Sequence, residues 1–262
     1  MTRVTSHILL GGCELSSPVR SVVMLLLRGW QSLSYVLIRC SKIVVSSRSL
    51  HVSCFSSSWA GLKRRSYWRH LRRSILGPPA PPYKQVTQTG DPILRCKASP
   101  VSIDQISHPD TLNVLDRMVS VLRTGGCVGL SAPQLGVPLR IMVFELTEKM
   151  CQIVPPEVLA AREMVPIPLK VFMNPQMRIL DSRTLTFPEG CWSIQGFSAM
   201  VPRYYAVEIS GLNEQRKPVT WQAKGWAARI VQHEMDHLDG VMYIDKMDPR
   251  TFTNINWPCV ND

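Results

Sequence analysis

Residues 109–123 form the clearest periodic segment of the chain, because their apolar residues recur every three or four positions. The apolar positions are Leu112, Leu115, Met118, Val119 and Leu122. This spacing places them on one face of an α-helix and predicts an amphipathic helix. Gly125 and Gly126 follow directly, as is typical of a helix end.

A second helix is predicted over residues 226–238, near the end of the chain. It begins with the apolar residues Trp226, Ala227, Ile230 and Val231 and continues into a more polar turn. Gly240 lies just beyond it, where a left-handed backbone is easily adopted by glycine.

Most of the chain between these helices has the composition of β-strands. Strands are predicted over residues 140–146, 169–173 and 176–180, with a turn at Asn174-Pro175 between the last two. Residues 199–210 and 219–222 are predicted to form a hairpin that turns through residues 211–217. The pattern favours an α+β fold, with short antiparallel β-sheets around a central helix, residues 226–238.

Charge divides the chain into two unequal parts. The net charge of the 262 residues is +11, but residues 1–90 contain 13 Lys/Arg and one acidic residue, whereas residues 91–262 contain 17 Lys/Arg and 18 Asp/Glu. The basic excess therefore lies outside the predicted folded domain. Direct nucleic-acid binding by that domain is not indicated by its charge.

The first part of the chain has the composition of an organellar transit peptide, rich in Ser and Arg and nearly free of acids. The apolar run 22–27 is too short to span a membrane and ends at Arg28. A secretory signal is less consistent, because the chain lacks an Asn-x-Ser/Thr sequon. A basic RNA-binding tail and an over-extended gene model are the remaining alternatives.

These observations predict three regions. Residues 1–66 are expected to be a transit segment that is removed, and residues 67–90 a proline-rich linker with the start of the mature chain. Residues 91–262 are expected to be the folded domain. None of the eight cysteines forms a C-x-x-C pair, so neither a disulfide framework nor a zinc ribbon is indicated.

The second predicted helix contains the motif H-E-x-x-H, formed by His233, Glu234 and His237. Residues four apart lie about one turn apart on the same helix face, so both imidazoles can bind one divalent ion while Glu234 handles protons. Cys191, in the segment Glu189-Gly190-Cys191, offers a thiolate as third ligand. Three protein ligands leave a tetrahedral ion one open position, which is typical of a catalytic metal site.

A third segment, residues 127–134, reads Cys-Val-Gly-Leu-Ser-Ala-Pro-Gln. Gly129 permits a close backbone approach, and the Gln134 side chain supplies a neutral amide donor. Taken alone, this segment fits a buried connection to the following strand more readily than a functional site.

Together, residues 127–134, 189–193 and 232–237 resemble the peptide deformylase family, in particular its mitochondrial members. The family has the segments G-x-G-L-x-A-P-Q, E-G-C-x-S and Q-H-E-x-D-H in this order, and the resemblance extends from about Tyr67 to the end of the chain. Two residues depart from the pattern. Cys127 replaces the first glycine, and Trp192 stands where bacterial members commonly have leucine.

The resemblance implies a hydrolase that removes the formyl group from the N-terminal formyl-methionine of nascent chains in the mitochondrial matrix and releases formate. It implies one divalent metal ion per chain, with Fe²⁺ or Co²⁺ favoured over Zn²⁺ or Ni²⁺. The implied partners are N-formyl-methionyl peptides. Transient ribosome contact and a homodimer are compatible with this interpretation, and no membrane span is expected.

Roles for individual residues follow from the same resemblance. The metal ligands would be Cys191, His233 and His237. Glu234 would transfer protons, and the Gln134 amide and the Trp192 backbone N–H would stabilise the oxyanion. The residues expected to bind substrate are Val128, Gly129, Leu130, Glu189 and Gly190.

Three further residues are assigned supporting or rival roles. Glu189 is expected to pair with Arg203 and brace the loop that carries Cys191. Asp236 is expected to support the site rather than bind the metal. Cys127 is retained as a rival fourth ligand, since a Cys2His2 site would be structural and inert.

Two other functions compete with deformylation. An H-E-x-x-H metallopeptidase usually takes its third ligand from a Glu or His downstream of the motif, but none follows His237. A non-catalytic, metal-stabilised binding module would need neither Glu234 nor Gln134. Both alternatives are therefore less consistent with the sequence than a deformylase.

Overall fold

The computed structural model describes residues 80–257, and the predicted transit segment, residues 1–66, lies outside them. The main helices are α3 (Pro109–Gly125) and α6 (Gly225–Leu238), with two short ones, α4 (Glu148–Cys151) and α5 (Pro156–Arg162). The strands are β1 (Gly129–Ser131), β2 (Ile141–Leu146), β3 (Ile167–Cys191), β4 (Ile194–Leu212), β5 (Pro218–Lys224) and β6 (Thr253–Asn254). Short 3-10 turns are η1 (Pro92–Arg95), η2 (Ile103–Gln105), η3 (Ala132–Leu135), η4 (Tyr243–Asp245) and η5 (Pro249–Thr251).

The strands form one antiparallel sheet in the order β1-β2-β3-β4-β5, and β6 pairs with β4. The predicted antiparallel pairing is present, but in one sheet rather than in several short ones. The reason is the length of β3 and β4, which continue through bulges and so link all the other strands. The α+β class holds for the described residues.

Strand β2 shows why this sheet is buried on both faces. Met142 and Phe144 belong to the core cluster that includes α6, whereas Ile141 and Val143 belong to the cluster that includes α3. Successive side chains of a strand point to opposite faces. The apolar run Ile141–Phe144 within β2 therefore reflects a helix on each face of the sheet.

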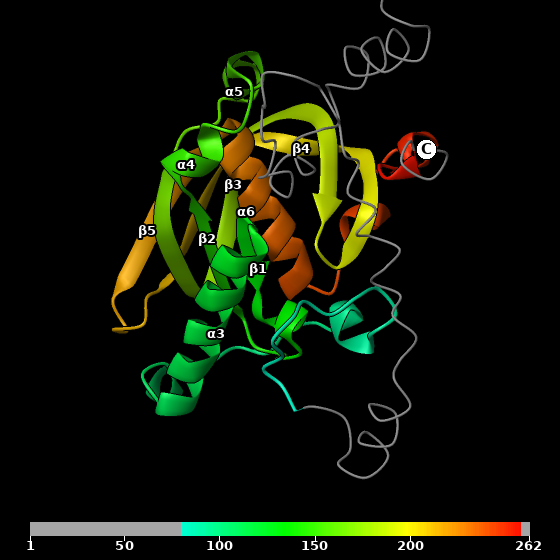
Figure 1. Ribbon diagram of the computed structural model, residues 1–262. Helices are drawn as coiled ribbons and strands as arrows, with labels where there is room; N and C mark the ends of the chain where they lie inside the picture. Colours follow the sequence, from blue (N-terminus) through cyan, green and yellow to red (C-terminus); the bar gives the residue numbers. More distant parts are fainter. Residues whose placement is uncertain (1–79, 258–262) are drawn as a thin grey trace, which may run out of the picture.

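The two main helices closely follow the sequence patterns that predicted them. Helix α3 ends at Gly126, whose φ of 71° is left-handed. Helix α6 runs through the middle of the molecule, with β4 curving around one side of it (Figure 1). Nearly all of its residues are buried, including the polar Arg229, Gln232 and Glu234. A buried polar helix face needs internal partners, which is the first structural sign of a functional site.

The turn predicted at Asn174-Pro175 is wrong, because β3 continues through it as a single strand with a shift of register between Met173 and Gln176. Asn174 adopts a left-handed φ of 52° there, and its side chain turns back to a neighbouring segment. Its Nδ2 donates to the Val101 carbonyl at 2.7 Å, and its Oδ1 accepts from the Val101 N–H at 2.8 Å. The Asn-Pro pair is therefore a bulge that fixes residue 101.

Among residues 80–257, no helix combines the length and the apolar character needed to cross a membrane.

We expect Asn174→Ala to lower the free energy of unfolding by about 3 kcal/mol. The substitution removes the partners of two Val101 backbone groups, and Val101 is only 2% exposed, so each group costs about 1–3 kcal/mol when left unpaired. Chemical denaturation measures the change. Asn213→Ala, which removes an exposed side-chain acceptor in the β4–β5 turn, is the control. Equal losses in the two variants would contradict this role for Asn174.

Candidate metal centre

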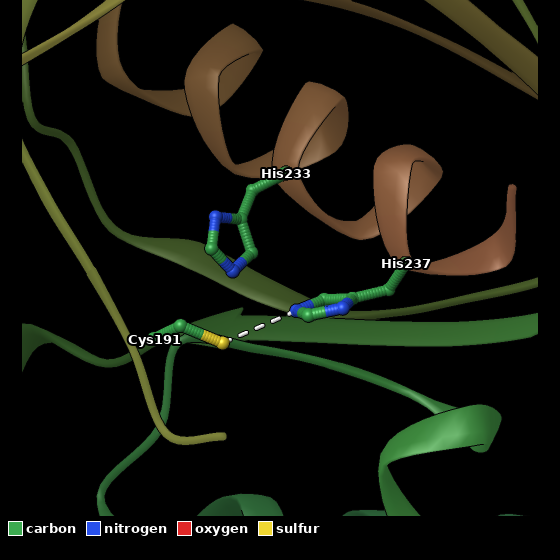
Figure 2. A group of neighbouring side chains, drawn as sticks. All are labelled: Cys191, His233 and His237. Atoms are coloured by element: carbon green, nitrogen blue, oxygen red, sulfur yellow. Dashed lines mark hydrogen bonds between the residues drawn. The ribbon is translucent and has the colours of Figure 1, made fainter. Parts of the chain in front are cut away.

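Helix α6 places His233 and His237 one turn apart, with both rings directed toward Cys191 (Figure 2). Cys191 is the last residue of β3, directly before the two-residue turn that leads into β4. The Cys191 Sγ lies 3.2 Å from the His237 Nε2. One potential ligand atom from each of the three residues lies within 4.8 Å of the others.

The second nitrogen of His233 is held by a carboxylate. Its Nδ1 lies 2.7 Å from the Oε1 of Glu189, which is 2% exposed. Glu189 accepts a hydrogen bond from the Nδ1–H, which leaves Nε2, on the side of Cys191, as the nitrogen that can bind a metal ion. Burial would raise the pKa of the Cys191 thiol, but His237 and His233 hold it well below its ordinary range. The sulfur is thus available as a thiolate.

Two arginines balance the charge of Glu189. Arg203 donates to both of its oxygens, at 3.1 and 2.5 Å, which confirms the expected pair. Arg229 donates to Oε2 at 2.9 Å. Burial alone would raise the pKa of Glu189, but Arg203 and His233 outweigh that effect and lower it. Glu189 is therefore a carboxylate that links β3 and β4 to α6.

Asp236 extends this network away from the three candidate ligands. Its Oδ2 accepts from Arg203 Nη1 at 2.5 Å, and its Oδ1 accepts from Lys246 Nζ at 2.6 Å. Asp236 is not in the group of candidate ligands. It holds Arg203 in place, which agrees with the supporting position expected for it.

The Gln134 side chain is oriented by two serines. Its Oε1 accepts from the Ser131 N–H at 3.0 Å and from the Ser131 hydroxyl at 3.2 Å. Its Nε2 is thereby directed to the other side, where it lies 3.2 Å from the Ser193 Oγ and 3.7 Å from the Cys191 Sγ. The amide donor of Gln134 therefore faces the candidate metal centre.

The Glu234 side chain packs so closely against Gly129 that no larger residue fits at position 129. A Cβ atom at position 129 would stand 2.5 Å from the Glu234 Oε1 and 2.9 Å from the Ile230 Cγ2. Burial raises the pKa of Glu234. Among the described residues its Oε2 has no hydrogen-bond partner. A buried carboxylate oxygen without a partner needs water or a ligand.

Cys127 is close to these residues without joining the three candidate ligands. It does not belong to the group formed by Cys191, His233 and His237. Burial, followed by the negative charges of Glu234 and Cys191, raises the pKa of its thiol. The position of Cys127 outside that group weighs against a Cys2His2 site.

A pocket opens onto the centre and contains most of the residues predicted from the sequence. Those lining it are Val128, Gly129, Gln134, Glu189, Gly190, Cys191, Trp192, His233 and Glu234. His237 is 1% exposed and lies behind them. Leu130 does not line the pocket, because its side chain is wholly buried in the cluster that includes α3.

Three more residues of α6 line the pocket and were not predicted to do so: Trp226, Arg229 and Ile230. Their spacing contains the signal that would have identified them. Arg229 and Trp226 lie four and seven positions before His233, and Ile230 lies three positions before it. Residues at such spacings share one helix face.

A family model described as polypeptide deformylase matches residues 83–253 of the chain. The chain belongs to the peptide deformylase family. It is 58% identical over 199 residues to the mitochondrial peptide deformylase of Homo sapiens, and the aligned region covers 76% of this chain and 82% of that protein. It is 42% identical over 172 residues to the chloroplastic/mitochondrial peptide deformylase 1A of Arabidopsis thaliana, where the aligned region covers 66% of this chain and 64% of that protein.

Solved structures of deformylases share the fold. A class I type b peptide deformylase from Acinetobacter baumannii, bound to Met-Ala-Ser, superposes with a TM-score of 0.55 at 26% identity, covering 62% of this chain and 96% of that one. The peptide deformylase from Synechococcus elongatus in complex with actinonin gives 0.53 at 31% identity, covering 66% and 82%. These matches assign the antiparallel sheet and its few helices to the deformylase fold.

Deformylases are metal-dependent, and the residues of this chain fit a metal ion. Cys191, His233 and His237 supply one sulfur and two nitrogens, a donor set that suits Fe²⁺, Co²⁺, Ni²⁺ and Zn²⁺. Glu189 accepts from the outer nitrogen of His233, as carboxylates commonly do for metal-binding histidines. Glu234, whose Oε2 has no hydrogen-bond partner among the described residues, lines the same pocket.

We expect Gly129→Ala to lower turnover by about 100-fold or more while metal content stays unchanged. The added methyl group displaces the Glu234 carboxylate, and a misplacement of about 1 Å costs on that order. Formate release and metal analysis measure the two effects. Gly211→Ala, which is crowded by the Met173 carbonyl at 2.8 Å away from the pocket, is the control. Similar turnover in both variants would show that the contact with Gly129 does not position Glu234.

Proposed function

We propose that this deformylase uses Cys191, His233 and His237 to hold one divalent ion and Glu234 to move protons during hydrolysis of the formyl group. As a peptide deformylase, the protein removes the N-terminal formyl group of nascent polypeptides. The observation that supports the residue roles is the convergence of a thiolate and two imidazoles beside a buried, partnerless carboxylate oxygen.

Glu234 is the proton carrier in this proposal. An ion held by the three ligands would supply Lewis-acid activation and would lower the pKa of a water molecule to about 7. The Glu234 carboxylate accepts a proton as water adds to the formyl carbon. It then delivers a proton to the amine as the carbon–nitrogen bond breaks, so the products are formate and a free N-terminus.

The Gln134 amide supports the oxyanion in this proposal. When water adds to the formyl carbon, its carbonyl oxygen gains negative charge and needs hydrogen-bond donors in a fixed position. The Gln134 Nε2 is directed toward Cys191 by the contacts of its own Oε1 with Ser131. We assign the second donor to the Trp192 backbone N–H. Loss of one such donor typically costs about 3 kcal/mol of transition-state stabilisation.

Substrate contacts are assigned to the pocket walls. Val128, Gly129, Glu189 and Gly190 line the pocket, and we retain them as substrate-binding residues together with the backbone of Leu130. The apolar Trp226 and Ile230 on the facing side of the pocket suit a methionine side chain. Glu189 acts mainly through His233 and the two arginines.

The cellular setting of this activity is proposed as mitochondrial. The similarity to the human mitochondrial enzyme and the Ser/Arg-rich composition of residues 1–66 both support it. We propose the matrix as the compartment, residues 1–66 as the removed segment, 67–90 as the proline-rich linker with the start of the mature chain, and 91–262 as the metal-dependent deformylase domain. Ribosome contact and a homodimer stay predictions. The donor set suits all four ions, and we propose Fe²⁺ or Co²⁺ because the resemblance to the family favours them.

The first test is Glu234→Gln, which keeps the size of the side chain but removes its basic carboxylate. We expect formate release from a formyl-Met peptide to fall by about 10²- to 10⁴-fold, the usual contribution of a general acid–base. Bound metal should stay at the wild-type level, because the three ligands are unchanged. Glu157→Gln, an exposed residue of α5, is the matched control. Near-normal turnover in Glu234→Gln would exclude Glu234 as the base.

Metal removal separates an enzyme from a metal-stabilised module. We expect chelation to abolish formate release while the circular dichroism spectrum and cooperative melting persist, because the two large core clusters contain none of the three ligands. Anaerobic addition of Fe²⁺ or Co²⁺ should restore turnover. A structural metal would behave differently, since its removal normally unfolds the domain. Unfolding on chelation would therefore favour the module.

A further inference from the structure

Residues 83–89 lie across the outside of the two turns that flank the candidate metal centre, and we call this segment the strap. It has no helix or strand assignment and precedes η1. One turn is η3, which contains Gln134. The other is the Trp192-Ser193 turn between β3 and β4. The strap hydrogen-bonds to both turns.

In every hydrogen bond between the strap and these turns, the strap provides the donor and the turn provides a backbone carbonyl. The Tyr83 N–H donates to Leu135 at 2.9 Å. Thr87 donates to the Gln134 carbonyl through its N–H at 2.8 Å and its hydroxyl at 3.2 Å. The remaining hydrogen bonds reach the second turn. The Gln88 side-chain amide donates to the Trp192 carbonyl at 3.0 Å. Thr89 donates to the Ser193 carbonyl through its N–H at 2.8 Å and its hydroxyl at 3.0 Å.

One of these contacts acts on a peptide group that also touches the proposed ligand cysteine. The Trp192 carbonyl and the Ser193 N–H belong to the same planar peptide. The carbonyl accepts from the Gln88 side chain, and the N–H lies 3.4 Å from the Cys191 Sγ. Holding one end of a rigid plane fixes the direction of the other. The strap thus sets the donor that faces the Cys191 sulfur.

The strap is not itself part of the pocket wall. Among the described residues that line the pocket, none belongs to residues 83–89. Its position is fixed instead by packing on η3, where the Tyr83 ring occupies the space that a Cβ at Gly136 would need, at 2.4 Å. Gly136 has a φ of 80°, so glycine there serves both the turn and the strap.

We propose that the strap is a positioning segment for deformylation, which holds the turns bearing Gln134 and Cys191–Ser193 at the spacing that the reaction requires. This inference rests on the proposed function. It also means that a maturation cut compatible with full activity falls before Tyr83. The strap acts through the backbone of other residues, so its loss should lower kcat more than it raises KM.

Two variants of the full chain remove strap donors without deleting backbone, and a third variant retains them. Gln88→Leu removes the contact with Trp192, and because Gln88 is exposed the fold is not at risk. Thr87→Val/Thr89→Val removes both hydroxyls with little change of shape, and Thr87→Ser/Thr89→Ser retains them. Thr124→Val is the matched control, since its hydroxyl donates to the Ser120 carbonyl on the exposed side of α3 and Thr124 does not line the pocket.

Formate release and amide hydrogen exchange are then measured on the same metal-loaded proteins. We expect kcat to fall about tenfold in Gln88→Leu and in the valine pair, with KM changed less than about twofold. Exchange should accelerate in residues 131–136 and 190–194 only. The serine pair and Thr124→Val should match the wild type.

The two readouts separate failure of this inference from failure of the proposed function. A wild-type kcat and wild-type exchange in Gln88→Leu and in the valine pair would contradict the positioning role of the strap. An equal fall of kcat in the serine and valine pairs would contradict it as well. Absence of deformylation in the wild-type protein would instead overturn the proposed function. Exchange would still show in that case whether residues 83–89 hold the two turns.

Discussion

The buried carboxylate of Glu189 is the interaction on which the rest of the site depends. A carboxylate this deeply buried is stable only when it is paired and hydrogen-bonded. Arg203 and Arg229 supply the charge, and His233 Nδ1 supplies a further contact. Glu189 thereby connects the strand that ends in Cys191 with the helix that carries both histidines. Loss of either arginine would leave buried charge unbalanced, a change that typically costs about 3–5 kcal/mol.

The same constraint explains the composition of α6. The helix is buried along nearly its whole length, so its polar residues must all find partners within the protein. Arg229 and His233 find theirs in Glu189, and Gln232 finds its partners in the backbone of Tyr204. Among the described residues the Oε2 of Glu234 has no partner, and Glu234 lines the same pocket as Cys191 and His233. Arg229 and Gln232 thus stabilise the helix, Glu234 serves the proposed chemistry, and His233 takes part in both.

Much of this arrangement could be predicted from local patterns. The periodic segments identified α3 and α6, and the three motifs identified most of the residues that line the pocket, but not Trp226, Arg229 and Ile230. Local patterns failed where long-range contacts decide the outcome. Asn174-Pro175 looks like a turn, but pairing of β3 with β2 and β4 on either side of it makes it a bulge. The strap has neither a helical nor a strand-like pattern of apolar residues. Its hydrogen-bond acceptors are distant in sequence, so no local pattern could identify it.

X-ray absorption spectroscopy of the Co²⁺-loaded protein tests most directly whether Cys191, His233 and His237 together hold a catalytic metal. We expect one sulfur at about 2.3 Å and two imidazole nitrogens at about 2.0–2.1 Å, with a light atom in the remaining position. The sulfur should disappear in Cys191→Ser and persist in Cys127→Ser. Two sulfurs in the wild-type protein, with one lost in Cys127→Ser, would contradict this assignment and indicate a closed structural site.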